Sequence, residues 1–103
     1  MTPILEITKQ QVKEWLETTT KENFSIRDCE DCPMAVFMRE ARGEVGKAKT
    51  YGFASANGGV PQWPSWVTDF IEQWDRIDRL NYSRLLTRGS KQQALELLAK
   101  INE

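Results

Sequence analysis

The chain has 103 residues, of which 40% are hydrophobic and 28% are charged, and this predicts one globular domain spanning residues 1–103. It contains no histidine, which excludes a Ser-His-Asp triad and removes the commonest metal ligand. The net charge of −1 leaves no basic excess to neutralise phosphates, which argues against nucleic-acid binding.

The first predicted element is a helix that begins after Thr8. Thr8 and Gln11 have the spacing of a capping box, in which each side chain bonds the other residue's backbone. The β-branched run at 18–20 should end this helix. Its apolar stripe, which should dock on the core, consists of Val12, Trp15 and Leu16.

Residues 21–31 are expected to form an irregular connector, and a second helix should follow. Pro33 suits the first helical position, since its missing N–H needs no partner there. Gly43 is a natural C-terminal stop. Apolar residues at helical spacing make this the most buried element that we expect; they are Met34, Phe37, Met38 and Ala41.

The β part is predicted within residues 44–63. Asn57–Gly58 is the best hairpin signal, because a tight turn of this kind needs positive φ at its centre. Pro61 and Pro64 should confine the returning strand to an edge. We therefore expect two or three short strands.

The strongest helical periodicity follows Pro64, which suits a first helical turn. A looser stretch, 79–89, is expected next, with a turn at 87–89. Ser90 and Gln93 then form a second capping box, which begins a last amphipathic helix. The stripe of the earlier helix comprises Val67, Phe70, Ile71, Trp74 and Ile77, and that of the last comprises Ala94, Leu97, Leu98 and Ile101.

These elements predict an α+β fold with about four helices packed on a short antiparallel hairpin or three-stranded sheet. The core should gather the large apolar residues of every stripe. We expect it to contain Val12, Trp15, Leu16, Phe37, Met38, Phe53, Val67, Phe70, Ile71, Trp74, Leu98 and Ile101.

Cys29 and Cys32 are the only cysteines, and their spacing permits three functions besides a structural one. A redox pair requires a lowered thiol pKa, whereas the neighbouring carboxylates Asp28, Glu30 and Asp31 should raise it. Half of a Cys₄ zinc site would need a second chain. A surface disulfide is disfavoured in a reducing cytosol. Burial as small apolar side chains is the interpretation that we favour.

Two groups of residues are candidates for binding a partner. The first is a basic patch in an otherwise acidic or neutral chain, consisting of Arg39, Arg42, Lys47 and Lys49. The second is the pair Trp63 and Trp66, since tryptophan is enriched at binding hot spots. The alternatives are a solvated polar face for the first group and a core role for the second.

Three segments resemble a group of small uncharacterised proteins from bacteriophages, actinobacteria and cyanobacteria. The segments are residues 7–12, residues 31–41 with Asp-Cys-Pro-Met-Ala-Val-Phe-Met-Arg-Glu-Ala, and residues 60–75 with Phe-Ile-x-x-Trp-Asp near their end. The shared pattern is a Cys-Pro-hydrophobic-Ala run followed by a helix with Phe-Ile-x-x-aromatic-Asp. The resemblance implies a small intracellular protein from a mobile element or its bacterial host. The group has no assigned activity that could be carried over to this chain.

The sequence as a whole predicts a non-enzymatic protein-interaction module without catalytic residues or cofactors. Its partner would be another protein or a second copy of the chain. The longest apolar run is six residues including Pro33, so no membrane span is expected, and without a visible signal peptide the cytoplasm is the expected location. Two alternatives are a thiol-redox or zinc-linked switch through Cys29 and Cys32, and an inhibitor of a host protein encoded by a mobile element.

Overall fold

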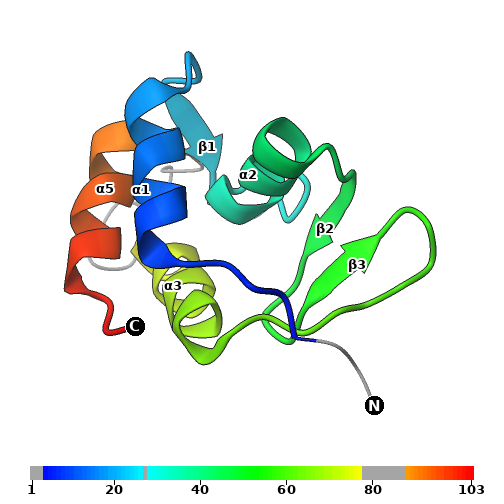
Figure 1. Ribbon diagram of the computed structural model, residues 1–103. Coiled ribbons are helices and arrows are strands. Elements are labelled where there is room, and N and C mark those ends of the chain that lie inside the picture. The colour runs from blue at the N-terminus through cyan, green and yellow to red at the C-terminus, as the bar shows by residue number, and fades with distance from the viewer. Residues whose placement is uncertain (1–3, 27, 78–87) are drawn as a thin grey trace.

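Helices and two small antiparallel sheets form the part of the chain that the computed structural model describes, residues 4–26, 28–77 and 88–103 (Figure 1). The helices in these ranges are α1 (Lys9–Thr18), α2 (Pro33–Arg42), α3 (Ser65–Asp75) and α5 (Lys91–Lys100). The strands are β1 (Asn23–Ser25), β2 (Gly46–Ala48), β3 (Phe53–Ser55) and β4 (Arg88–Ser90). The predicted α+β class is therefore confirmed.

Both predicted capping boxes begin their helices. At α1 the Thr8 hydroxyl accepts from the Gln11 amide at 3.2 Å, and the Thr8 amide donates to the Gln11 side chain at 3.0 Å. At α5 the reciprocal bonds between Ser90 and Gln93 measure 3.0 and 2.8 Å. Each box provides side-chain acceptors for two backbone N–H groups at a helix start, and this fixes where the helix begins.

The predicted boundaries of α2 also hold. Cys32 is its N-cap and Pro33 its first residue. Gly43 follows the last turn with φ of 67°, a left-handed conformation that favours glycine. In α3 the first helical residue is Ser65, and Pro64 is the N-cap rather than part of the first turn.

The predictions for 21–31 and 87–89 were wrong, because each segment contributes a strand. β1 and β4 pair antiparallel, with Phe24 opposite Gly89. A three-residue strand is too short for alternation to be recognised in the sequence. The rest of the predicted loose stretch, 79–87, lies outside the described residues.

The hairpin of β2 and β3 turns earlier than predicted. Lys49 and Gly52 close it with bonds in both directions, of 2.9 and 3.4 Å. Asn57–Gly58 instead lies in a turn after β3, where Gly58 has φ of 94°. This later turn brings the chain back beside β3, where the Phe53 amide donates to the Pro61 carbonyl at 2.9 Å.

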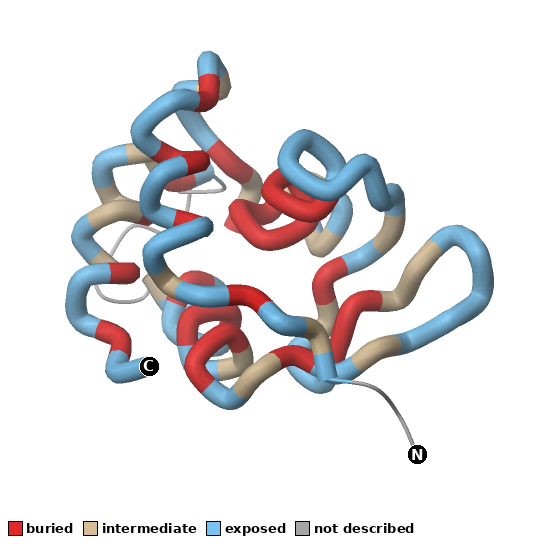
Figure 2. Tube along the Cα trace, in the orientation of Figure 1, coloured by how far each residue is buried: buried red, intermediate tan, exposed pale blue. Residues whose placement is uncertain are grey.

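The core fills the space between the helices and the inner faces of both sheets. Every residue predicted for the core is buried, and the buried face of each helix points inward in Figure 2. A line of aromatic rings connects the elements, with centroid separations of 5.6 to 6.4 Å. Its members in order are Phe37, Trp15, Phe24, Trp74 and Phe70.

The helices and the hairpin occupy different ends of the molecule. α1 and α5 lie side by side, and α3 packs against α5 (Figure 1). The β2–β3 hairpin projects on the opposite side, next to α2. This arrangement leaves the outer face of the hairpin and the adjacent side of α2 open to solvent.

Candidate functional site

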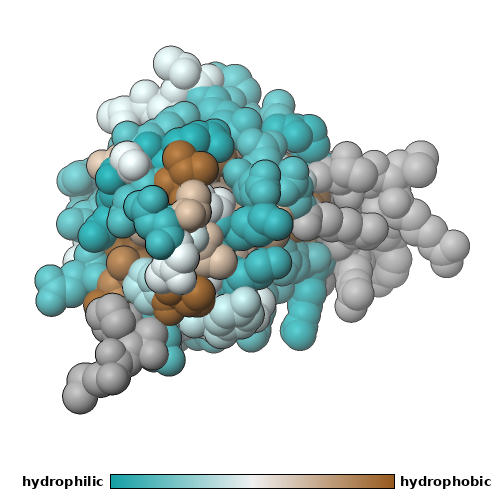
Figure 3. Space-filling model, turned by 90° about the vertical axis from the view of Figure 1, so that its right-hand side faces the viewer, coloured by the Kyte–Doolittle hydropathy of each residue, from teal (hydrophilic) through white to brown (hydrophobic). Residues whose placement is uncertain are grey.

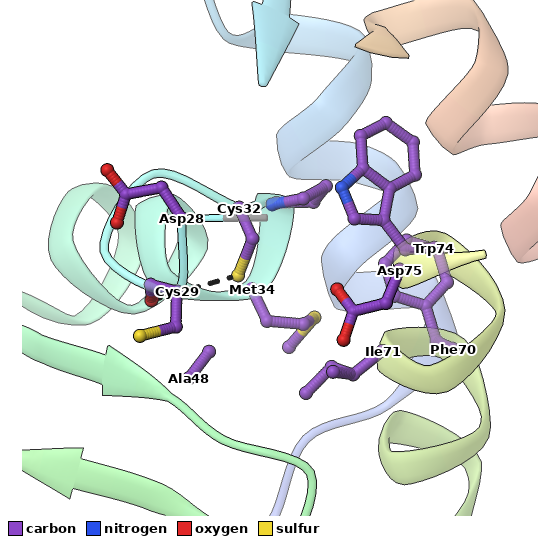
Figure 4. Close-up of a pocket in the computed structure, with 10 residues that line it drawn as sticks. Asp28, Cys29, Cys32, Met34, Ala48, Phe70, Ile71, Trp74 and Asp75 are labelled. Carbon is purple, nitrogen blue, oxygen red and sulfur yellow. Dashed lines mark hydrogen bonds between the residues drawn. The ribbon is translucent and has the colours of Figure 1, made fainter. Parts of the chain in front are cut away.

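The two cysteines border a small cavity of about 50 Å³ at the start of α2. Cys32 is buried and Cys29 is half-buried. Figure 4 shows both thiols on the α2 side of this cavity, and Ile71, Trp74 and Asp75 of α3 on the other side. Such a volume has room for one or a few water molecules and is far smaller than the space that an organic ligand needs.

The environment of Cys32 makes its thiol a poor nucleophile. Burial raises the pKa of this thiol to about 12, the Asp75 carboxylate adds to the rise, and the amides of Ala35 and Met34 only partly oppose it. The Cys32 sulfur lies 3.9 Å from the Cys29 carbonyl oxygen, a weak contact that holds it against its own loop. These features support the structural interpretation of Cys32.

A metal centre finds no support in the described part of the chain. No cluster of three or more cysteine, aspartate or glutamate side chains within residues 4–26, 28–77 and 88–103 is arranged to hold an ion. A zinc site built on Cys29 and Cys32 would therefore need ligands from elsewhere.

A second site lies between α2 and the outer face of the hairpin, a surface groove of about 340 Å³. We call it the α2–hairpin groove. Four apolar residues form its floor, and three charged residues form its rim. The floor consists of Ala35, Val45, Ala54 and Ala56, and the rim of Glu30, Arg39 and Lys47.

Hairpin geometry explains this floor. Lys47 pairs with Ala54 in the sheet register, so both side chains point to the same face. Val45 lies two residues before Lys47 and shares that face, and its side chain remains 60% exposed. The paired residues Ala48 and Phe53 point inward and are buried. The hairpin thus has an inner face in the core and an outer face in the groove.

Of the four basic candidates, the structure brings only Arg39 and Lys47 to the groove. Arg42 lies one turn further along α2, where its guanidinium donates to the Glu6 carbonyl at 3.3 Å and lies 3.8 Å from the Glu44 carboxylate. Lys49 belongs to the hairpin turn and does not line the groove. The four residues inferred from sequence therefore do not form one patch.

No protein-family model, curated protein or solved structure matches this chain. Within the described ranges, no helix has both the length and the apolar character needed to cross a bilayer.

Trp63 and Trp66 lie in the core, which is the alternative to a role in binding a partner. Both rings are buried, at 5% and 3% exposure. Each indole N–H has a backbone partner, Trp63 at the Lys49 carbonyl (2.6 Å) and Trp66 at the Ile7 carbonyl (2.9 Å). A satisfied N–H allows the whole ring to leave solvent.

The floor and rim residues of the groove that sequence reasoning missed are Glu30, Ala35, Val45, Ala54 and Ala56. Parity along the chain groups Val45 with Phe53, which suggests one shared face. The early turn reverses this grouping, since Phe53 pairs with Ala48 rather than with Lys47. Knowledge of the turn position would have been enough to find the exposed valine.

Proposed function

We propose that this protein is a non-enzymatic protein-interaction module that docks its partner in the α2–hairpin groove. The observation that carries the proposal is the state of the Arg39 side chain. It is exposed on the groove rim, and its guanidinium has no hydrogen bond or ion pair within the described residues. An arginine held beside apolar surface is a frequent anchor in protein interfaces.

The groove has the composition of a small docking surface. Val45 and the alanines of the floor offer apolar area, while the charged rim can set the orientation of a partner. Figure 3 shows the hairpin side of the molecule, where hydrophobic and neutral side chains form a band with hydrophilic side chains on both sides. Among the described residues this apolar surface is exposed, and covering it with a partner would lower the free energy of the complex.

The test is site-specific photo-crosslinking in the cells that produce the protein. A photoreactive amino acid replaces Val45 in one variant and Glu17 in the control; Glu17 is exposed on α1, away from the hairpin. We expect the Val45 probe to yield one discrete adduct, and Arg39→Glu in the same chain to reduce its yield. The Glu17 probe should not give this adduct.

Mass spectrometry of the adduct then identifies the partner. An adduct of the chain with itself would assign the groove to self-association, and an adduct with another protein would assign it to a heterologous partner; both support a docking function. Equal adducts from Val45 and Glu17, or an adduct that Arg39→Glu leaves unchanged, would contradict docking in this groove.

A further inference from the structure

We propose that the α2–hairpin groove binds an acidic segment of a protein, with a carboxylate of that segment held by Arg39 and Lys47. This inference rests on the proposed docking function and adds the chemistry of the occupant. It follows from the charges on the rim, from the state of their ion pairs, and from the apolar character of the floor.

Both cations on the rim are available to an incoming carboxylate. The guanidinium of Arg39 has no ion pair or hydrogen bond within the described residues. Lys47 lies 3.7 Å from the Glu30 carboxylate, a long contact between side chains that are 52% and 61% exposed. Exposed pairs of this kind are weak, since water screens them and each long side chain loses freedom on pairing. An incoming carboxylate can therefore replace Glu30 at Lys47 at little cost.

The guanidinium of Arg39 is suited to a carboxylate. Its planar N–H groups can donate two parallel hydrogen bonds to the two oxygens of an acid. The groove also concentrates positive charge in a chain whose net charge is −1, because its rim carries two cations and one anion. Charge complementarity of this kind sets orientation and speeds association.

The floor selects what lies beside the carboxylate. Ala35, Ala54 and Ala56 present methyl groups, and Val45 is the largest apolar side chain among the floor residues. The groove is a surface feature of about 340 Å³, which gives room for apolar side chains beside the carboxylate. We infer an occupant in which an aspartate or glutamate is flanked by apolar residues.

Polyanions such as nucleic acids share the negative charge but fit less well. Glu30 lies on the same rim and repels a continuous line of phosphates. Two lysine or arginine contacts neutralise only about two phosphates, which gives weak binding at physiological salt. Binding of a nucleic acid is therefore the less favoured alternative, and the experiment below also measures it.

The experiment selects binders from a displayed library of random peptides on the full chain, and measures the affinity of the selected peptides by calorimetry. We expect the selected sequences to be enriched in aspartate and glutamate next to apolar residues. Arg39→Glu should weaken binding about tenfold or more, because it places like charges together. Glu30→Gln should strengthen binding about twofold, because it removes the internal competitor of the peptide at Lys47.

Arg42→Glu is the matched control, since it makes the same charge change on the same helix outside the groove. Its effect on affinity should be clearly smaller than that of Arg39→Glu, because the Arg42 guanidinium bonds the Glu6 carbonyl and does not line the groove. Raising the salt from about 50 to about 300 mM should weaken the wild-type complex more than the Arg39→Glu complex. Circular dichroism of each variant confirms that the fold is retained.

The outcomes separate this inference from the proposed function. Selected peptides that are neutral or basic, yet shift the NMR signals of the groove residues, would overturn the acidic occupant and leave docking in the groove intact. Selected peptides that bind elsewhere, unaffected by Arg39→Glu and by Val45→Asp, would overturn both. A labelled DNA or RNA oligonucleotide that binds more tightly than any peptide, and is lost with Arg39→Glu, would assign the rim to phosphate and overturn the inference.

Discussion

Gly89 lies in the middle of β4, and the ring of Trp74 occupies the space where a side chain would be. A Cβ atom at this position would lie 2.5 Å from the nearest ring carbon of Trp74, which is itself 1% exposed. The indole N–H of Trp74 also donates to the Ser25 carbonyl of β1 at 2.9 Å. The ring therefore cannot retreat without breaking the contact that holds it to the β1–β4 sheet.

Gly89→Ala should accordingly lower the free energy of unfolding by about 1–3 kcal/mol, the usual cost of overpacking a core. Urea denaturation measures this change. Gly59→Ala is the matched control, since a Cβ at Gly59 meets nothing within 4 Å, and it should be neutral or slightly stabilising. Equal stabilities for the two variants would contradict the packing of Trp74 on β4.

Asp31 links distant parts of the chain through its carboxylate. Its two oxygens lie 3.0 Å from the Lys21 ammonium and 2.9 Å from the Arg88 guanidinium. Burial alone would raise the pKa of this carboxyl, but the bonds from Lys21 and Arg88 outweigh burial and hold the pKa below its ordinary value. The carboxylate thus stabilises the folded state in its charged form.

Asp31→Asn should destabilise the protein by about 1 kcal/mol at neutral pH, a modest value because solvent screens the pair with Arg88. A lowered folded-state pKa gives stability that is present above the unfolded value of about 3.9 and is lost as the pH falls through the folded value. The difference between wild type and variant, followed by thermal denaturation against pH, should therefore shrink below about pH 4. Asp69→Asn, at an exposed position on α3, is the matched control substitution.

At the scale of elements, α1 and α5 each begin at a capping box. Thr8→Ala and Ser90→Ala each remove a capping hydroxyl and should each cost about 1 kcal/mol in chemical denaturation. Thr18→Ala is the control. It deletes a hydroxyl that bonds back to the Glu14 and Trp15 carbonyls within α1, and it should change stability by less than about 0.5 kcal/mol.

The positions of the strands were harder to predict from the sequence than the starts of the helices. The sequence signal at Asn57–Gly58 correctly predicts a turn, but the paired strands β2 and β3 close at Lys49–Gly52. A strand of three residues carries one or two inward side chains, which is too few for a period of two to stand out. Its register depends on the partner strand, and here that register also decides that Val45 faces the groove.

At the scale of the whole molecule, Cys32 lies where three elements meet. Its cavity is lined by Met34 of α2, Ala48 of β2 and the inner face of α3. The thiol can reach a reagent only when these elements separate, and its pKa of about 12 leaves it on the order of a thousandfold less ionised than at its ordinary value of 9.0. Cys32 therefore reports opening of the core.

Labelling with a thiol reagent near pH 8 should modify one cysteine per native chain quickly, and Cys32 only at the rate of unfolding. In Cys29→Ser the fast phase should disappear. Rapid modification of both thiols in the native state would contradict the burial of Cys32 and would restore the thiol-switch alternative.

The burial of the four tryptophans depends on hydrogen-bond partners that tertiary contacts supply. Each indole N–H finds a partner on another element or connector: Glu40 for Trp15, and backbone carbonyls for the other three. The stripes predicted burial for Trp15 and Trp74. The burial of Trp63 and Trp66 depends on Lys49 and Ile7, whose carbonyls only the fold brings within reach.

The sequence by itself determined where α1, α2 and α5 begin and which faces they bury, because capping boxes, a proline at a helix start and apolar stripes act between residues a few positions apart. Only the tertiary structure decided the β1–β4 pairing, which joins Phe24 to Gly89, and which basic residues line the groove. The groove belongs to the second class, because its floor exists only once the hairpin register has turned Val45 outward beside α2.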